Sequence, residues 1–451
     1  MTRPEQVVII GGGFGGLEAA KALEHAPVEV TLIDRQNHHC FQPLLYQVAT
    51  ATLSPADVAW PIRAILSRQR NVRVVMAHVT GLDTAGRRVC SNRGEFSYDH
   101  LVIATGATHA YFGHEDWARY APGLKRIEDA TEIRRRILTP FELAELALDR
   151  QERERLTTFV VVGGGPTGVE MAGAIADMAR EALPPDFRHV DPRCAQVLLV
   201  EAGPRLLSAF PESLSAYTRL ALERRGVQVL LGAPVTEIDE DVVVIGDRHI
   251  ATGAVVWAAG VAASAATDWL GAERDRAGRV LVQPDLSVPG KAGIFVIGDT
   301  ASVVSASGKP VPGVAPAAKQ MGRYVGTVIS ARARGKAAPE PFHYRHQGDL
   351  ATIGRKAAVV NTNRFILRGL PAWIFWSLAH VYFLIGIRNR IGVGFSCAWE
   401  YLTFGRRARL ITEPANAPAA EAALKDTGAS PAAVPAVGHA DVVANPGPIW
   451  G

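Results

Sequence analysis

Two copies of one pattern constrain this chain more than any other feature. Each copy runs from an apolar, β-branched stretch through a glycine turn and a helix-period stretch to a second apolar run that ends in an acid. That order is typical of the βαβ unit of dinucleotide-binding proteins. We therefore predict an α/β fold with two Rossmann-type dinucleotide-binding domains. The copies are VVIIGGGFGGLEAAKAL at 7–23 with VEVTLIDR at 28–35, and FVVVGGGPTGVEMAGAIAD at 159–177 with QVLLVEAG at 196–203.

The first copy carries the dinucleotide fingerprint G-x-G-x-x-G at Gly11, Gly13 and Gly16. Glycine allows a tight turn at the first position, close approach to a pyrophosphate at the second and close helix–strand packing at the third. The free N–H groups of the following helix then face the phosphates. Asp34 closes the second strand, where an acid accepts hydrogen bonds from ribose hydroxyls.

The second copy repeats these features with Gly163, Gly165 and Gly168 and with Glu201 as the terminal acid. Two modules in one chain imply two dinucleotides, one passing electrons to the other, and FAD with a nicotinamide cofactor is the natural pair. A carboxylate at Glu201 suits the 2′-hydroxyl of NADH and repels the 2′-phosphate of NADPH. NADH is therefore favoured, although Arg205 nearby could soften the preference.

Composition excludes several other classes. The net charge of +4 argues against a dedicated nucleic-acid binder. No two cysteines stand in a C-x-x-C relation, so a dithiol relay has no residues to run on, and we expect all four to be mostly buried. His38 and His39 are adjacent and no nearby cysteine or acid completes a site, so no metal is expected. The N-terminal apolar run is too short for a signal peptide, which favours a cytoplasmic catalytic body.

For the segments between and after the two copies, the sequence indicates only the approximate secondary structure. Residues 71–103 and 226–260 indicate short strands, and 294–301 indicates a buried strand that ends in Gly-Asp. Residues 127–155 indicate charged helix, with Arg134, Arg135 and Arg136 on a solvated face.

The paired glycine motifs, LVIATGAT at 101–108, VVWAAGV at 255–261 and VIGD at 296–299 resemble the two-dinucleotide-binding-domain flavoproteins, which include glutathione-reductase-like enzymes. The resemblance covers about residues 5–330 and implies FAD in the first module and the nicotinamide cofactor in the second. It places Asp299 on the ribityl chain of the flavin. The FAD-binding residues it implies are Gly11, Gly13, Phe14, Gly15, Gly16, Asp34, Arg35, Gln42, Ala104, Thr105, Gly106, Gly298, Asp299, Ala315 and Gln320. Those implied for NADH are Gly163, Gly165, Thr167, Gly168, Glu170, Glu201, Ala259 and Gly260.

Three further segments are similar to the type II NADH dehydrogenases, the single-subunit NADH:quinone oxidoreductases. They are FQPLLYQVATATLSP at 41–55, VPGVAPAAKQMGRYVG at 311–326, and IGRKAAVV with WIFWSLAHVYFLIGIRNR within 353–390. The resemblance implies hydride transfer from NADH to FAD and then two-electron transfer to a membrane quinone, without proton pumping.

The same resemblance implies roles for single residues. Glu170 would lie near the flavin–nicotinamide contact, Lys356 at the flavin end of the quinone channel, and Gln42 and Tyr46 on the flavin-side wall. The family often carries two glutamines in 311–326; here Pro316 stands at the first and Gln320 is kept at the second. The resemblance therefore implies quinone contact more firmly for Gln320 than for Pro316. Glu170, Gln320 and Lys356 are the candidate catalytic residues.

Residues 370–386 are apolar and aromatic, and 391–404 place apolar side chains on one helical face with arginines after them. We interpret both as interfacial segments of a monotopic protein that binds the lipid surface on the cytoplasmic face of the cell membrane. A buried helix, the interface of a homodimer and a true span are the alternatives.

The predicted organisation interleaves the two modules. FAD binding falls to 1–115 and 266–335, a helical connector to 116–156, NADH binding to 157–265, membrane association to 336–412 and a disordered tail to 413–451. The rival functions are another flavin reductase, of the sulfide:quinone or ferredoxin type, and a non-catalytic NADH-responsive scaffold.

Overall fold

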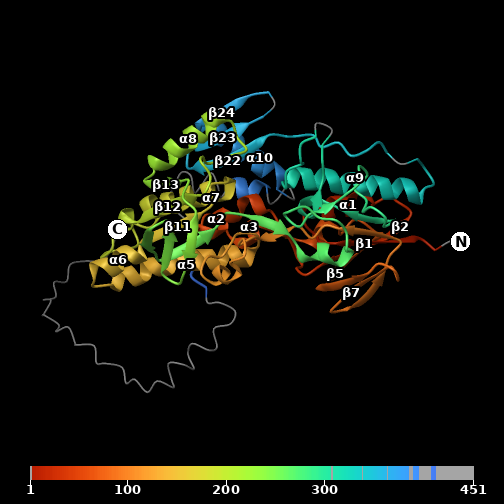
Figure 1. The fold of residues 1–451 in the computed structure, drawn as a ribbon, viewed down its shortest axis with the longest axis horizontal. Helices are drawn as coiled ribbons and strands as arrows, with labels where there is room; N and C mark the ends of the chain where they lie inside the picture. The colour runs from red at the N-terminus through yellow and green to blue at the C-terminus, as the bar shows by residue number, and fades with distance from the viewer. Residues whose placement is uncertain are drawn as a thin grey trace, which may run out of the picture. The chain divides into compact units, whose positions relative to one another are not determined.

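A computed structural model of the chain describes residues 3–305, 308–337, 339–362, 364–384, 390–395 and 408–412. The predicted tail, most of 391–404 and Cys397 lie outside these ranges. Contacts divide the chain into a first unit that ends at Ile411 and a second that begins at Thr412. The elements of the first unit are labelled in Figure 1.

The first sheet is all-parallel, in the order β20-β9-β1-β2-β5. Strands β9 and β20 and the last four residues of β1 are buried, as expected where both faces of a sheet are covered, whereas Glu29 of β2 and Arg73 of β5 are exposed. The late strand β20 pairs with β9, so a segment near residue 295 completes a sheet begun at residue 5. This confirms the buried strand predicted at 294–301. The strands are β1 Glu5–Ile10, β2 Val28–Asp34, β5 Val72–Met76, β9 His100–Ile103 and β20 Ile294–Val296.

Two helices lie against each other beside this sheet: α1 (Phe14–Ala22) and α9 (Ala315–Ala333). Their backbones approach closely because a Cβ on Gly322 would stand 2.1 Å from the carbonyl oxygen of Gly15. Figure 1 shows the two helices side by side. Shorter elements border the same region: β3 His38–Cys40, η1 Gln42–Leu44, α2 Leu45–Ala49, α3 Pro55–Val58, β4 Ala59–Pro61, α4 Ile62–Ile65, β6 Val79–Asp83, β7 Arg88–Ser91, β8 Gly94–Ser97, η5 Ala265–Leu270, β19 Val280–Leu281, η6 Gly298–Thr300 and β21 Ala301–Ser302.

The second sheet repeats the first, with four parallel strands in the order β13-β12-β11-β17. The helix α7 (Pro166–Asp177) follows β11 as α1 follows β1. A three-stranded antiparallel sheet, β14-β15-β16, precedes β17 along the chain. The remaining bounds are β11 Thr158–Val162, β12 Gln196–Glu201, β13 Val227–Leu231, β14 Val235–Ile238, β15 Val242–Ile245, β16 Arg248–Ala251, β17 Ala254–Trp257, η3 Met178–Ala182, η4 Pro192–Cys194 and α8 Glu212–Glu223.

Two connections join the modules. An antiparallel ribbon pairs β10 (Ala107–His109) with β18 (Val261–Ala263). The 3-10 turn η2 (Glu115–Arg119) then leads to the predicted helical connector, which forms α5 (Ile127–Leu146) and α6 (Arg150–Leu156).

The solvated face predicted for the three arginines of α5 is wrong for Arg134. Its side chain is only 5% exposed, because it shares the inward stripe with Ile133 and Ile137. The guanidinium donates to the carbonyl oxygens of Val48 and Leu53, which satisfies the buried charge. Burial lowers the pKa of Arg134. Arg135 and Arg136 pair with Glu132 instead and stay partly exposed.

The C-terminal region of the first unit is a three-stranded antiparallel sheet and a helix. The strands are β22 (Asp349–Gly354), β23 (Ala357–Asn361) and β24 (Ile366–Gly369), followed by α10 (Leu370–Phe383). Residues 390–395 are also helical. Within the described ranges, no helix has the length and apolar character that a membrane crossing requires.

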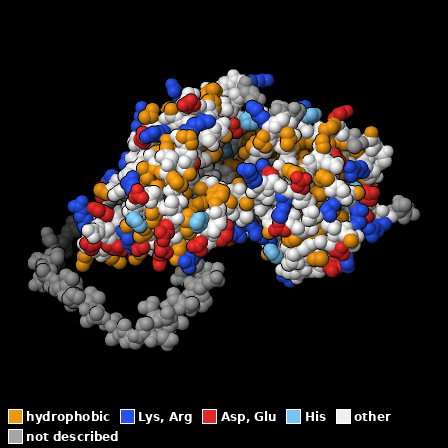
Figure 2. All heavy atoms as spheres, viewed as in Figure 1, with side chains coloured by type: hydrophobic (Ala, Val, Ile, Leu, Met, Phe, Trp, Pro, Cys, Tyr) orange, Lys and Arg blue, Asp and Glu red, His pale blue; other side chains and the backbone are white. Residues whose placement is uncertain are grey.

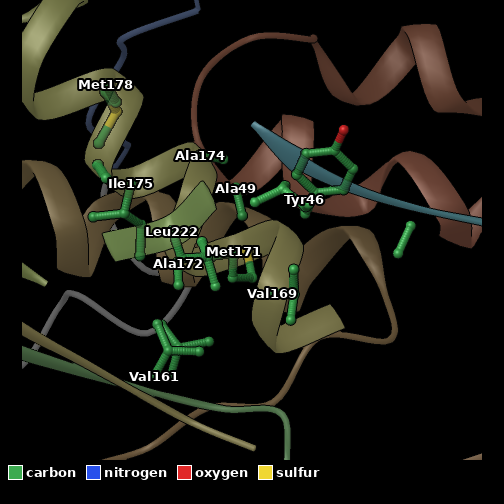
Figure 3. Packing of buried hydrophobic residues seen from close by; sticks show 14 of the residues in the cluster. Tyr46, Ala49, Val161, Val169, Met171, Ala172, Ala174, Ile175, Met178 and Leu222 are labelled. Carbon is green, nitrogen blue, oxygen red and sulfur yellow. The ribbon is translucent and has the colours of Figure 1, made fainter. Parts of the chain in front are cut away.

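The largest apolar core lies between the modules and the C-terminal sheet. Figure 3 shows Tyr46 and Ala49 of α2 against Val169 and Met171 of α7. On α7, a Cβ at Gly173 would stand 1.8 Å from the carbonyl oxygen of Ile353, so β22 lies directly on this helix. The core therefore ties the C-terminal sheet to the start of the second module.

Candidate functional site

A single cavity of about 730 Å³ is shared by both modules. It is lined by the glycine turn after β1, the ends of β2 and β9, the first turn of α7 and the segment after β17. Thirteen residues predicted for FAD line it: Gly11, Gly13, Phe14, Gly15, Asp34, Arg35, Gln42, Ala104, Thr105, Gly106, Gly298, Asp299 and Ala315. Thr167, Glu170 and Gly260, predicted for NADH, line the same cavity.

The three fingerprint glycines of the first turn have the different environments that the motif predicts. Gly11 has a φ of +104°, and a Cβ on Gly16 would lie 1.8 Å from the Gly11 carbonyl oxygen. Both positions are too crowded for a Cβ; Gly11 still lines the cavity, whereas Gly16 does not. Around Gly13 nothing lies within 4 Å of a Cβ position, so its backbone faces open space. That opening at the start of α1 fits a pyrophosphate.

Asp34 both stabilises the first glycine turn and lines the cavity. Its carboxylate accepts the Gly12 N–H at 2.6 Å and the Gln36 N–H at 2.7 Å. Burial raises the pKa of Asp34, against the opposing effect of these two hydrogen bonds. A carboxylate has about four acceptor positions, so capacity remains for ribose hydroxyls.

The second module reproduces this arrangement. Glu201 accepts the Gly164 N–H at 2.5 Å and the Gly203 N–H at 2.6 Å. Gly163 and Gly168 pack as Gly11 and Gly16 do, and Gly165 is open like Gly13. Gly163, Gly165, Gly168, Glu201 and Ala259 do not line the shared cavity. They lie in the turn between β11 and α7, in the first turn of α7, and at the carboxyl ends of β12 and β17.

Arg205 is engaged elsewhere. Its guanidinium donates to the carbonyl oxygens of Phe210 and Ser208, at 2.7 and 2.6 Å, and to the Ser215 hydroxyl at 3.0 Å. In this position it stabilises its own loop.

Two histidines that the sequence analysis considered only as metal ligands lie beside the first glycine turn. His39 is buried against the Phe14 ring, and its Nδ1 lies 3.1 Å from the Gly12 carbonyl oxygen. Burial lowers the pKa of His39 to about 4, so the ring is neutral near pH 7. His38 lines the cavity, and its buried Nε2 has no hydrogen-bond partner among the described residues. That atom and the open turn at Gly13 fit a bound nucleotide better than an empty interior.

Glu170 is a half-buried acid on the wall of the cavity that the two modules share. It stands one turn into α7, which begins at Pro166, and accepts the Thr352 N–H from β22 at 3.4 Å. Burial raises the pKa of Glu170 to about 8. The carboxyl is therefore mostly protonated at pH 7 and can donate a proton within the cavity.

The other two candidate catalytic residues do not reach the cavity. The Gln320 amide exchanges two hydrogen bonds of 2.9 Å with the backbone of Arg345. Lys356 lies in the β22–β23 turn, whose Arg355 N–H binds Asp177 at the far end of α7. Seven residues of helix separate Asp177 from Glu170, about 10 Å. The quinone roles of Gln320 and Lys356 stay predictions, and Pro316 also lies off the cavity lining.

The expectation of buried cysteines is wrong for Cys194, which is exposed at the end of the short helix η4; Cys40 and Cys90 are half-buried. Cys40 lines the cavity, where burial raises the pKa of its thiol to about 12. Such a thiol is protonated and a weak nucleophile. The described residues contain no group of three or more side chains that could hold a metal ion.

Sequence reasoning also missed Trp257 and Ser264. Trp257 ends β17 and lines the cavity, and the Ser264 hydroxyl lies 2.6 Å from that of Thr105. The signal for Trp257 was its place at the end of a strand parallel to β11, because ligands bind at such carboxyl ends.

Comparison with known proteins agrees with this geometry. The family model described as pyridine nucleotide-disulphide oxidoreductase matches residues 5–322. The type II NADH:quinone oxidoreductase NdhA of Mycobacterium tuberculosis is 45% identical, over 89% of this chain and 87% of the relative. The type II NADH:quinone oxidoreductase Ndh of the same organism is 43% identical, over 91% of each.

The fold also matches a solved structure. The NDH2 of Plasmodium falciparum, solved in complex with NADH, superposes with a TM-score of 0.82 at 21% identity and covers 91% of this chain and all of its own. This likeness confirms the α/β architecture.

Proposed function

The chain belongs to the pyridine nucleotide-disulphide oxidoreductase family and, within it, to the type II NADH:quinone oxidoreductases, and from this premise we propose that it oxidises NADH and reduces a membrane quinone, with FAD as cofactor. The observation that carries the proposal is the shared cavity. Gly13 and Phe14 of the first module and Thr167 and Glu170 of the second line one space. A hydride donor held by one module therefore meets an acceptor held by the other.

FAD, when bound, supplies the redox chemistry, since a flavin can accept a hydride and then release the two electrons singly or as a pair. The chain's own residues bind and orient the two nucleotides. Gly13 and Asp34 hold the first through backbone N–H groups and a carboxylate; Gly165 and Glu201 hold the second. The buried walls, which include Tyr46 and Trp257, exclude water from the contact.

Glu170 would hold the proton that quinone reduction consumes. Its Oε1 accepts the Thr352 N–H, which leaves Oε2 as the oxygen that carries the proton. A carboxyl with a pKa of about 8 gives up this proton readily near neutral pH.

Membrane attachment would fall to α10. Its exposed side chains are apolar or aromatic and recur at helical spacing: Leu370, Pro371, Ile374, Phe375, Leu378, Tyr382 and Phe383. The opposite side, with Ala372 and Trp376, packs on the protein. A helix with one apolar face open to solvent suits the lipid interface. We place it on the cytoplasmic face of the cell membrane, where NADH is available, and infer no proton pumping.

The charge on the face seen in Figure 2 gives no support to a nucleic-acid partner. Basic and acidic side chains are interspersed over the face seen in Figure 2, and neither sign forms a continuous stripe there. Nucleic-acid binding calls for a basic stripe.

The decisive experiment is anaerobic mixing of the purified, FAD-containing protein with NADH. We expect rapid bleaching of the flavin absorbance and its recovery on adding a soluble quinone. Sulfide in place of NADH should not bleach it, because Cys40 is a protonated thiol. Recovery with ferredoxin but not with quinone would favour a ferredoxin reductase, and no bleaching by NADH would favour a non-catalytic scaffold.

A further inference from the structure

Phe112 is an exposed aromatic residue with an unfavourable backbone conformation. Its φ is +55°, and its side chain is 70% exposed. A bulky residue in the left-handed region is an outlier that costs free energy and persists where the surroundings fix it, often at ligand clamps. Exposure of a Phe ring adds a second cost, so the position calls for an explanation.

The ring lies on the rim of the shared cavity. A Cβ on Gly260 would stand 2.5 Å from Phe112 Cζ, so the ring covers the Gly260 backbone. Gly260 and Val261 line the cavity, and Val261 is itself half exposed. The Phe112 ring also lies 6.3 Å from that of Trp257, centroid to centroid.

Neighbouring hydrogen bonds hold this rim in place. The Ala110 N–H donates to the Gly260 carbonyl oxygen at 3.2 Å, and Trp257 Nε1 donates to the Ala110 carbonyl oxygen at 2.9 Å. The Tyr111 ring stacks on Trp257 at 5.1 Å. The backbone on both sides of Phe112 is therefore fixed while its ring remains open to solvent.

Strand order tells which half of NADH passes this rim. Glu201 ends β12 and Gly260 follows β17, and β11 with its glycine turn lies between those strands. Figure 1 shows β12 beside β11. A dinucleotide whose pyrophosphate sits at the glycine turn and whose adenosine ribose meets Glu201 extends its other half toward Gly260. That half carries the nicotinamide.

We propose that the Phe112 ring packs against the nicotinamide riboside half of NADH and aligns it at the cavity mouth. The proposal rests on the NADH-oxidising function above. The ring offers a planar apolar surface that needs no ordering, because the backbone already fixes it, and it makes no contact with adenosine. Phe112 is a substrate-binding residue in this arrangement and takes no part in proton or electron transfer.

The first test compares Phe112→Gly and Phe112→Asn with Phe112→Tyr in the full-length holoenzyme. Gly and Asn suit a positive φ and remove the ring, whereas Tyr keeps it. We expect the KM for NADH to rise about three- to tenfold in the first two, the worth of one aromatic contact. The KM for quinone and kcat at saturating NADH should stay unchanged, and Phe112→Tyr should resemble the wild type. Leu148→Ala, at a fully exposed remote leucine, is the matched control.

The second test uses ADP-ribose, which lacks nicotinamide, as a competitive inhibitor. Phe112→Gly should leave its inhibition constant unchanged, whereas Glu201→Gln should weaken it. An unchanged KM in Phe112→Gly, or equal weakening of NADH and ADP-ribose, overturns the inference. If Phe112→Gly loses flavin, Phe112→Leu against Phe112→Tyr decides, since only the loss of the planar ring should raise the KM. Absence of NADH:quinone activity in the wild type would instead defeat the proposed function.

Discussion

At the scale of single residues, the two terminal acids perform a task that the fingerprint does not mention. Asp34 and Glu201 each bind the N–H of the middle glycine of their own GGG run and one N–H just after their strand. Each acid therefore stabilises the glycine turn of its own module, independently of any contact with a ribose. A substitution there should disturb the turn as well as the ligand contact.

Glu201→Gln should reduce the preference for NADH over NADPH. The amide keeps one acceptor oxygen for Gly164 but removes the charge that repels a 2′-phosphate. We expect the ratio of kcat/KM for the two cofactors to fall about tenfold, the effect of roughly 1.4 kcal/mol. Arg205→Ala should leave the ratio unchanged, because its guanidinium is bound to its own loop. A ratio that moves with Arg205 and not with Glu201 would contradict this assignment.

Glu170→Gln should change the pH profile of quinone reduction. The pKa of Glu170 is raised to about 8 by burial, so the wild-type carboxyl carries a proton below that pH and loses it above. Turnover limited by proton delivery should therefore decline as the pH rises through about 8, and the variant should be slow without this decline. Steady-state rates with a soluble quinone from pH 6 to 9 provide the measurement; the same decline in the variant would assign it to another group.

The contribution of Glu170 to folding stability should also fall as the pH rises. A carboxyl whose pKa is raised in the folded state stabilises the fold below its unfolded pKa of 4.5, and this contribution is lost as the pH rises through about 8. Glu170→Gln should remove that part of the pH dependence of Tm.

At the scale of elements, α10 packs on the protein through one side and leaves an apolar side exposed to solvent. It packs on β23 and β24 through one side while its outer stripe is apolar and open. Leu378 and Tyr382 on that stripe are more than three fifths exposed, and Ile391 and Phe395 of the next helical segment are equally open. Exposing such an apolar stripe to water is unfavourable unless lipid or another protein covers it.

Ile374→Glu combined with Leu378→Glu should release the protein from membranes. Two charges on the stripe cannot enter the apolar boundary, whereas the cavity lies elsewhere. We expect co-sedimentation with anionic phospholipid vesicles to fall at least tenfold, while NADH oxidation with a soluble quinone is retained. Leu148→Glu, on an exposed leucine between α5 and α6, serves as the control and should sediment like the wild type. Unchanged sedimentation of the double variant would favour a dimer interface on α10.

At the scale of the whole molecule, the sequence predicted what repeats and what is periodic. The two glycine turns, their parallel sheets and the late strand at 294–296 are confirmed, because local patterns determine them. Arg134 was misjudged because charge type outweighed its helical position, and Cys194 because a short turn carries no burial pattern. The positions of Gln320 and Lys356 depend on how distant segments meet, which no local pattern encodes. The predicted domain boundaries stay predictions.

The interleaved first sheet makes FAD part of the stability of the molecule. Its strands come from the N-terminal segment and from a segment near residue 295. The cavity they border includes His38, whose Nε2 has no hydrogen-bond partner among the described residues and would be satisfied by a bound nucleotide. A ligand at about a hundred times its Kd stabilises the folded state by about 2.7 kcal/mol. Stripping the flavin should therefore lower Tm by several degrees, on the order of 2–4 °C for each kcal/mol lost. Adding FAD to the stripped protein should restore Tm, and FMN should restore it only in part, because FMN lacks the adenosine that Asp34 and His38 would meet. Equal rescue by FMN would remove the adenosine from this side of the cavity, and with it the role assigned to Asp34.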